Sequence, residues 1–168
     1  MKRTLLTLSL AAMLSACNAT SEPAPNAPQK PKYETYVSAG DVFPLQTVVD
    51  INGQAVSLTD HTKRKLVILF ATWCSDSQRT ITQLMKSPLA QDQNLTIVGI
   101  GREENAESLS KFEHDFATNF SLVADPERKL YSQFANAGIP RLILLDEQNK
   151  VVKTLIGEAP DTIEKVIW

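Results

Sequence analysis

The sequence predicts an α/β fold in which a mixed central β-sheet is flanked by helices and preceded by a β-hairpin. Apolar runs at residues 66–71, 95–100 and 141–145 are typical of strands buried on both faces. Two segments with apolar residues at helical spacing, 77–86 and roughly 105–118, follow the first and second of these runs. Strands that alternate with helices and then end in a hairpin form a mixed sheet.

The first expected element of the folded part is the N-terminal hairpin. Asp50-Ile-Asn-Gly53 joins two strand-like runs, Leu45–Val49 and Gln54–Ser57. An Asn-Gly pair between such runs is a strong hairpin signal, because both residues tolerate the positive φ angles of a tight turn. The strand over 66–71 comes next, and a short loop then leads into the helix over 77–86.

The remaining elements continue the alternation. After the strand over 95–100, the helix over 105–118 carries an apolar stripe that we expect to pack into the core. Asp125-Pro126 favours the start of another helix, with Asp as its cap and Pro at its first position. The expected order then closes with a strand over 141–145, a turn over 146–150, a strand over 151–156 and a helix over 161–168. The charged residues 63–65 and 103–104 are expected to be solvated ends of elements.

The N-terminal residues resemble the leader of a bacterial lipoprotein. Met1-Lys-Arg3 is basic, residues 4–14 are largely apolar, and Leu14-Ser-Ala-Cys17 resembles a lipobox. The resemblance implies a signal peptide over 1–16, lipidation of Cys17 and a stable membrane anchor; the alternative is an ordinary signal peptide with an incidental cysteine. A Pro-rich tether is expected over 17–35 and one folded domain over 36–168.

These features predict a protein of the cell envelope that faces the periplasm. An Asp directly after the lipidated cysteine commonly retains a lipoprotein at the inner membrane, so Asn18 favours the outer membrane. The 17 basic and 19 acidic residues give a net charge of −2, which does not favour nucleic-acid binding. His61 and His114 do not lie at ligand spacing from Cys74, so no metal site is expected. We also expect no cofactor and a monomer.

Cys74 is the candidate nucleophile. Lipidation of Cys17 would leave Cys74 as the one free thiol, with no partner for an internal disulfide. Cys74 lies where a buried strand passes into a helix, and the unpaired N–H groups and the positive end of the helix dipole there favour its thiolate. A dithiol oxidoreductase would carry a second cysteine at position 77, where this chain has Ser77. The Ser77 hydroxyl can donate a hydrogen bond to the thiolate.

Several ordered motifs resemble the TlpA/ResA-type extracytoplasmic thioredoxins, which overlap in sequence with the redoxins. The similarity covers nearly all of residues 39–168, and its motifs are Ala39-Gly-Asp-Val-Phe-Pro44, Asp50-Ile-Asn-Gly-Gln-Ala-Val-Ser-Leu58, Phe70-Ala-Thr-Trp-Cys74, Gly138-Ile-Pro140 and the hairpin over 146–151. The resemblance implies a thioredoxin-like fold with a cis Ile139–Pro140 bond facing Cys74. It further implies a substrate groove at Ile139 and Pro140, and we expect Trp73 and Arg141 to lie at its flanks, although Arg141 is unusual in this family. Arg141 is expected either to favour the thiolate or to be an exposed strand end.

The departures from this family fall at its chemical centre. The usual pattern is Cys-x-x-Cys-x-x-Glu-x-Pro, whereas this chain reads Cys74-Ser-Asp-Ser77-Gln-Arg-Thr80-Ile-Thr82. Ser77 cannot resolve a mixed disulfide, because a hydroxyl is a poor nucleophile toward sulfur at neutral pH. We therefore expect Cys74 to form mixed disulfides with envelope protein thiols and disulfides or with a small-molecule thiol. An external thiol must then complete the reaction.

Two other functions stay open at this point, and with them the question of whether the protein is an enzyme. The first is a catalytically inactive thioredoxin-fold module that binds partners at the same groove. The second is a peroxiredoxin-like peroxide reductase. A one-cysteine peroxiredoxin needs Thr or Ser three residues before its cysteine, where this chain has Ala71, and Thr72 is out of register.

Overall fold

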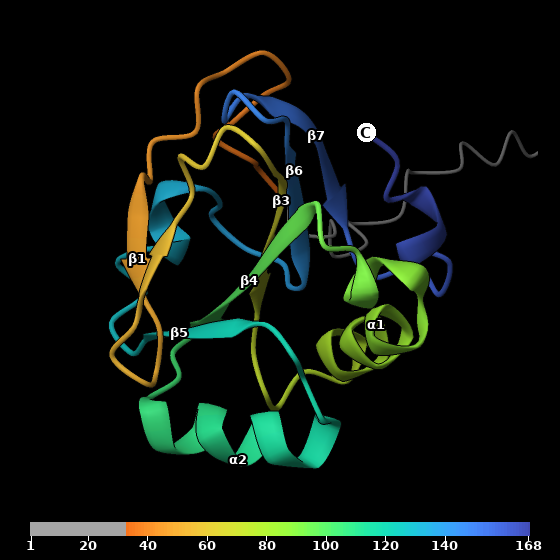
Figure 1. The fold of residues 1–168 in the computed structure, drawn as a ribbon. Coiled ribbons are helices and arrows are strands. Elements are labelled where there is room, and N and C mark those ends of the chain that lie inside the picture. The colour runs from red at the N-terminus through yellow and green to blue at the C-terminus, as the bar shows by residue number, and fades with distance from the viewer. Residues whose placement is uncertain (1–32) are drawn as a thin grey trace, which may run out of the picture. The chain divides into compact units, whose positions relative to one another are not determined.

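The computed structural model describes residues 33–168, so Cys17 and the predicted signal peptide lie outside the described residues. A five-stranded mixed sheet forms the centre of the described part, in the order β5-β4-β3-β6-β7 (Figure 1). Its strands are β3 (Arg64–Phe70), β4 (Leu95–Arg102), β5 (Ser121–Asp125), β6 (Arg141–Leu145) and β7 (Val151–Ile156). β3, β4 and β5 are parallel, whereas β6 and β7 run antiparallel to their neighbours. The predicted mixed sheet is thus confirmed.

The predicted N-terminal hairpin is also present. Strands β1 (Thr47–Val49) and β2 (Ala55–Ser57) pair antiparallel as a separate two-stranded sheet. The carboxylate of Asp50 closes the turn, since its Oδ1 accepts from Asn52 N and Gln54 N, each at 2.9 Å. Gly53 adopts a φ of 77°, which explains why the turn ends in glycine.

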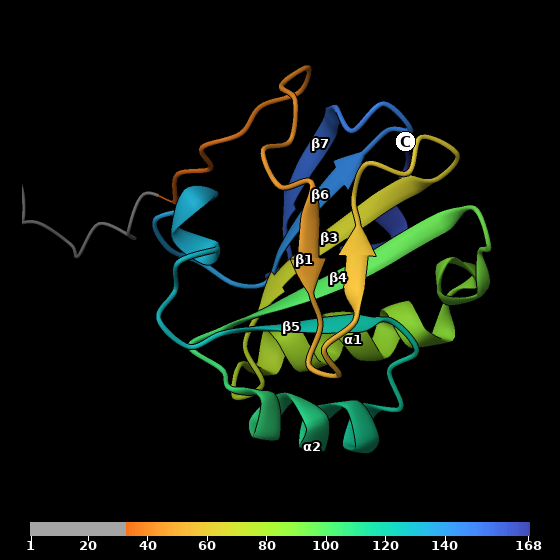
Figure 2. The same cartoon turned by 60° about the vertical axis from the view of Figure 1, so that its left-hand side comes forward.

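The two faces of the sheet are covered differently (Figure 2). Helices α1 (Ser75–Lys86) and α2 (Ala106–Phe116) pack on one face together with η3 (Ile163–Lys165). The hairpin, the segment before it and the short helix η2 (Tyr131–Gln133) cover the other face. β4 has a glycine where α2 comes close, because a Cβ on Gly101 would stand 2.7 Å from Leu109 Cδ2. Both helices begin shortly after the carboxyl ends of the two central parallel strands, α1 after β3 and α2 after β4.

Two predicted helices are wrong. Asp125-Pro126 does not begin a helix: Asp125 ends strand β5, which the sequence did not predict, and Arg128 has a φ of 59° that interrupts any helix. The carboxylate instead caps across the loop, accepting from Leu130 N at 3.0 Å and Tyr131 N at 2.8 Å. The closing helix over 161–168 is reduced to η3, a single 3-10 turn. A third such turn, η1 (Pro88–Gln91), follows α1.

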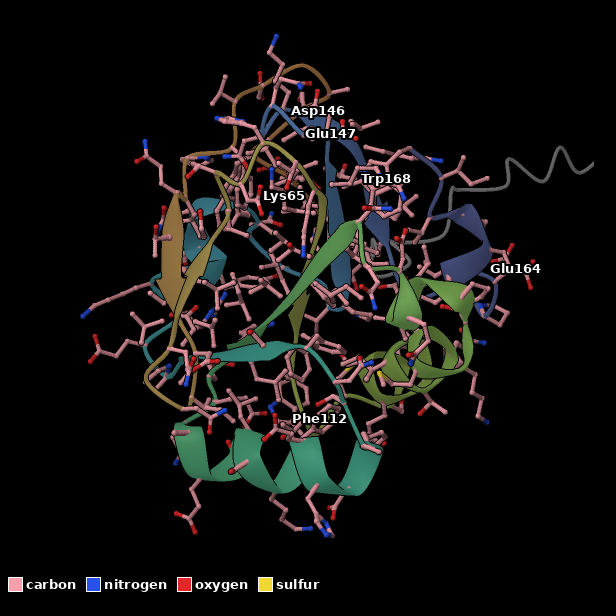
Figure 3. All side chains as sticks on the ribbon, viewed as in Figure 1. Lys65, Phe112, Asp146, Glu147, Glu164 and Trp168 are labelled. Atoms are coloured by element: carbon pink, nitrogen blue, oxygen red, sulfur yellow. The ribbon has the colours of Figure 1, made fainter. Side chains whose placement is uncertain are left out.

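The expectation that residues 63–65 are a solvated end is also wrong for Lys65. This side chain is fully buried where β3 begins, and Figure 3 shows it near the turn that carries Asp146 and Glu147. Its Nζ donates to the backbone oxygens of Glu147 at 3.2 Å and Asp146 at 3.5 Å. Burial lowers the pKa of Lys65, because the charged ammonium loses hydration there.

Candidate functional site

Cys74 is the N-cap of α1, at the carboxyl end of β3. Its backbone is extended, with φ −86° and ψ 118°, and its carbonyl accepts the first helical hydrogen bond from Gln78 N at 3.0 Å. The side chain is half-buried against the core on the hairpin side of the sheet. Its Sγ donates to the carbonyl oxygen of Ile139 at 3.7 Å. The predicted place of Cys74, at a strand-to-helix junction, is therefore the observed one.

The opposite wall of the site is the loop over residues 137–140, which enters β6. The Ile139–Pro140 bond is cis, as the family resemblance implied, and Gly138 has a φ of 83°. The end of β7 supports the loop from behind, since Gly157 N donates to Pro140 O at 2.8 Å. A Cβ on Gly157 would stand 2.4 Å from Pro140 Cγ, so only glycine fits there without displacing the proline.

Ser77 lies one helical turn after Cys74 and is fully buried. Its Oγ accepts from Ala71 N at 3.4 Å, so the hydroxyl closes the strand-to-helix loop. Within residues 33–168 no hydrogen bond joins Ser77 to Cys74. Thr80, which stands where the family has Glu, is also buried and donates to Gly157 O at 3.4 Å. Hydroxyls thus occupy both positions at which the family pattern has Cys and Glu.

Glu104 is a site residue that sequence reasoning missed. We expected it to be solvated, but it is only 4% exposed. One carboxylate oxygen accepts from Thr72 N at 2.8 Å and Thr72 Oγ1 at 2.6 Å, and the other accepts from Ser108 Oγ at 2.6 Å. The carboxylate thereby fixes the loop that carries Cys74. The available signal was its position directly after β4, since parallel neighbouring strands end at the same edge.

Trp73 and Arg141, the two predicted flanking residues, have opposite environments. Trp73 is 63% exposed and lies on the surface next to Cys74 in the chain. Arg141 is 2% exposed, so the expectation of an exposed strand end is wrong. Its guanidinium donates to the backbone oxygens of Ala137 and Gly138. At the site Trp73 is exposed and Cys74 is half-buried, whereas Ile139, Pro140 and Arg141 are buried.

The segment just before the hairpin also contacts this wall. A Cβ on Gly138 would lie 3.3 Å from the ring of Tyr33, which therefore rests on the loop. A hydrogen bond with Glu158 and the negative charge of that residue raise the pKa of the Tyr33 phenol. Tyr36 N donates to Phe134 O at 2.8 Å, and Thr35 pairs with Ala135 in an isolated antiparallel bridge.

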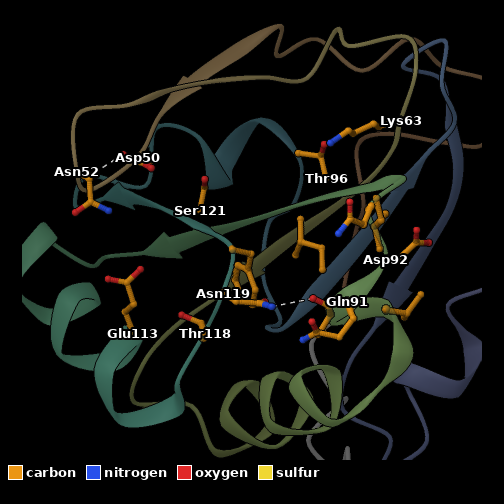
Figure 4. A pocket seen from close by; sticks show the side chains of 16 residues that line it. Asp50, Asn52, Lys63, Gln91, Asp92, Thr96, Glu113, Thr118, Asn119 and Ser121 are labelled. Carbon is orange, nitrogen blue, oxygen red and sulfur yellow. Dashed lines mark hydrogen bonds between the residues drawn. The ribbon is translucent and has the colours of Figure 1, made fainter.

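One hollow of the described residues lies away from Cys74. It is an open, mostly polar cavity of about 600 Å³ at the amino ends of β4 and β5, and its labelled residues include Asp50, Lys63, Thr96 and Ser121 (Figure 4). Because β3 and β4 are parallel, this is the opposite end of the sheet from Cys74. In residues 33–168 no three His, Cys, Asp or Glu side chains gather closely enough to hold a metal ion. The same part of the chain contains no helix long and apolar enough to cross a membrane.

Comparisons with known proteins agree with this geometry. The model of the AhpC/TSA family matches residues 39–154, and that of the prokaryotic membrane lipoprotein lipid attachment site matches residues 1–18. A curated relative, the thiol-disulfide oxidoreductase ResA of Geobacillus thermodenitrificans, is 25% identical over 126 residues, which cover 74% of this chain and 72% of ResA.

Solved structures give the same result. The thioredoxin domain of a thiol-disulfide oxidoreductase from Bacteroides vulgatus is 27% identical, with a TM-score of 0.61 over 79% of this chain and 99% of that one. The peroxidoxin BcpB of Mycobacterium tuberculosis shares the fold, with a TM-score of 0.61 at 18% identity over 77% of this chain and 93% of its own. The protein is thus a thioredoxin-fold protein of the TlpA/ResA-like type. The chain belongs to the AhpC/TSA family.

Proposed function

We propose that this protein performs thiol–disulfide exchange in the cell envelope through the single cysteine Cys74. The observation that carries the proposal is the placement of Cys74 at the N-terminus of α1, with its Sγ 3.7 Å from the carbonyl oxygen of Ile139 and a buried serine at position 77. A helix N-terminus favours a thiolate, and the thiolate is the reactive form. ResA, the relative named above, is a thiol-disulfide oxidoreductase, which supports the same chemistry here.

The reaction has two balanced steps. The Cys74 thiolate attacks one sulfur of a partner disulfide, so the partner's S–S bond breaks, a Cys74–partner S–S bond forms, and the second partner sulfur leaves as a thiolate. An external thiolate then attacks the partner sulfur of this mixed disulfide, forming a new disulfide with it and releasing the Cys74 thiolate. Ser77 takes no part in the second step, because its hydroxyl cannot displace sulfur at neutral pH.

The partner would dock across Cys74 and the Ile139–Pro140 peptide. An extended segment that lies beside the Ile139 backbone places its own sulfur next to Sγ, in the manner of strand addition. Trp73 adds an exposed aromatic surface at the edge of this contact. Such docking positions the attacked disulfide without any cofactor.

We further propose that the domain is held at the membrane through Cys17. The lipid attachment site matched over residues 1–18 supports this, because two or more acyl chains give stable anchoring. Residues 1–16 would then be removed, residues 17–35 would be the tether and residues 36–168 the domain. Asn18 favours the outer membrane, with the domain in the periplasm. Mass spectrometry of the natural protein should find acyl mass on Cys17, and an unmodified N-terminus beyond it would contradict the anchor.

Restoring the missing cysteine tests the single-cysteine mechanism. The wild-type chain should reduce insulin disulfides only when an external thiol is present, whereas Ser77→Cys, pre-reduced, should complete one reduction per molecule without it. The scaffold around position 77 supports such a gain, because residue 77 lies in the first turn of α1, three positions after the N-cap Cys74. Equal behaviour of wild type and Ser77→Cys would show that the missing cysteine is irrelevant.

Two further measurements separate the two competing functions. The family match and the peroxidoxin likeness favour a peroxide reductase as the second candidate. If the wild-type protein consumes peroxide in the presence of an added thiol, and Cys74→Ser does not, the function is peroxide reduction and not thiol–disulfide exchange. Partner binding that persists in Cys74→Ser, without exchange or peroxide reduction in the wild type, would identify a binding module.

A further inference from the structure

Arg141 is a buried cation for which residues 33–168 supply no carboxylate partner. It is 2% exposed, and no ion pair in the described part of the chain involves it. Burying a charge is costly unless hydrogen bonds compensate it, so an arginine in this position requires a physical reason. The reason lies in the oxygens that surround the guanidinium.

All of these oxygens are neutral, and most belong to the loop that faces Cys74. Nε donates to Ala137 O at 3.1 Å and to Gly138 O at 3.3 Å, and Nη2 donates to Ala137 O. Nη1 donates to the hydroxyl of Thr35, in the segment that runs alongside this loop. Tyr131 adds a second donor, since its hydroxyl bonds Gly138 O at 2.9 Å.

Ile139, which follows Gly138, is the residue that contacts the Cys74 thiol. Gly138 O accepts from Arg141 and Tyr131, and Ile139 O accepts from Cys74 Sγ at 3.7 Å. The positive φ of Gly138, 83°, belongs to the conformation in which the Ala137 and Gly138 carbonyls both reach the same guanidinium. The guanidinium reaches these two carbonyls and the hydroxyl from three separate nitrogens in one plane, whereas a lysine ammonium would have to serve all three from a single nitrogen.

We infer that Arg141 is a positioning residue that fixes the loop over residues 137–140 from beneath, so that an extended partner segment docks with its sulfur in line with Cys74. This inference rests on the proposed exchange function and names a residue that supports it without touching the substrate. The segment over 33–36 shares the same anchor through Thr35. Arg141 thus ties two stretches that are more than 100 residues apart in sequence, since its bond to Thr35 spans 106 positions.

Two disulfide probes with the same leaving group test the inference on the full chain. The first is the small reagent 5,5′-dithiobis(2-nitrobenzoate), and the second is a short cysteine-containing peptide whose sulfur carries the same thionitrobenzoate group. Release of thionitrobenzoate reports attack by Cys74 in both cases, after subtraction of the Cys74→Ser rate. Arg141→Lys and Arg141→Met should slow the peptide probe by about tenfold and the small probe by less than about twofold, because misplacing a docking loop costs rate only where docking matters.

The controls separate positioning from charge and from stability. Arg64→Lys is the matched control, because Arg64 is also a part-buried arginine in the sheet but pairs with Asp92 at the other end of β3; its peptide rate should equal that of the wild type. Wild-type rates in Arg141→Lys would show that a positive charge at position 141 is enough, which would overturn the inferred role of the guanidinium geometry. Equal slowing of both probes, or a lower melting temperature with unchanged rates, would also overturn the inference.

A second measurement keeps the inference testable if wild-type Cys74 reacts with neither probe, which would contradict the proposed function instead. The amides of Asn136 and Gly157 donate to Glu34 O at 3.4 Å and to Pro140 O at 2.8 Å beside this loop. Their hydrogen exchange should accelerate by about tenfold or more in Arg141→Met, because loss of the anchor frees the loop. The same amides should not change in Arg64→Lys. Unchanged exchange in Arg141→Met would refute the positioning role whatever the chemistry of Cys74.

Discussion

Two loops meet at Cys74, and buried charges of opposite sign hold them. The loop over residues 71–74 is fixed by the carboxylate of Glu104, which comes from the end of β4. The loop over residues 137–140 is fixed by the guanidinium of Arg141, which comes from the start of β6. Neither charge is paired with a side chain of opposite sign in residues 33–168; each is distributed over backbone groups and hydroxyls.

This difference in sign has a structural cause. The Cys74 loop presents the N–H and the hydroxyl of Thr72, two residues before the N-cap of α1, and the Glu104 carboxylate accepts from both. The Pro140 loop offers carbonyls, because proline has no N–H and Gly138 turns its own carbonyl toward the core. Each loop therefore takes the charge that its free backbone groups require.

The largest effect is expected when the group between the two loops is changed. Cys74→Ser should abolish covalent partner capture completely, because no other free thiol exists in residues 33–168. Both loops should keep their conformation, since the Sγ bond to Ile139 is one weak contact among several stronger ones. Capture of mixed disulfides from the native envelope, read on non-reducing gels, measures the loss. Persistent covalent adducts in this variant would assign the reaction to another group.

The next largest effect is expected at the second loop. In Gly157→Ala the new methyl would stand 2.4 Å from Pro140 Cγ and 3.2 Å from Thr80 Oγ1, so the proline must move. We expect a loss of about 1–3 kcal/mol in the free energy of unfolding and slower exchange with the peptide probe.

The matched control for this change is Gly99→Ala, which meets Leu122 Cδ2 at 2.9 Å in the core beneath the helices. It should lower stability, by urea denaturation, without changing the peptide rate of the folded protein. If both variants slow the peptide probe equally, the effect of Gly157→Ala does not pass through Pro140.

A comparable effect on stability is expected at the first loop. Glu104→Ala leaves the N–H and hydroxyl of Thr72 without their acceptor, which should cost about 1–3 kcal/mol of stability. The loop before Cys74 should loosen, and both probes should then be affected together, unlike in the Arg141 variants. Glu107→Ala, an exposed carboxylate in the first turn of α2, is the control and should change little. An equal response of the two variants would mean that Glu104 does not hold the loop.

The smallest effect is expected at a third buried charge that lies away from both loops. The pKa of Lys65 is lowered from 10.5, so the unfolded chain binds more protons than the folded one between that lowered value and 10.5. Stability should therefore rise with pH through this window, and Lys65→Met should flatten the rise. Thermal unfolding at several alkaline pH values measures it, with the exposed Lys150→Met as control. The peptide probe should react at the wild-type rate; a slower rate would connect Lys65 to the site.

Much of the fold could be predicted because its signals are local. The buried runs of β3, β4 and β6, the Asn-Gly hairpin and the faces of both helices are visible as patterns of apolar residues. Strand β5 escaped prediction because its five residues carry no long apolar run. The residues Asp125-Pro126 are a capping signal, but no helix follows them. The Asp125 carboxylate instead accepts a hydrogen bond from Tyr131 N and so stabilises the turn there.

The sequence by itself determined the residues on which the proposed chemistry rests: Cys74 at a strand-to-helix junction, Ser77 where the family pattern has a second cysteine, and the Gly138-Ile-Pro140 motif. These features follow from residue types and short spacings, which can be read directly from the sequence. Only the tertiary structure decided that Glu104 and Arg141 are buried and which loop each one holds. Whether these side chains are buried, and which groups they bind, depends on strands that are far apart in sequence but end at one edge of the sheet. The pattern of charged residues along the chain does not show which strands these are.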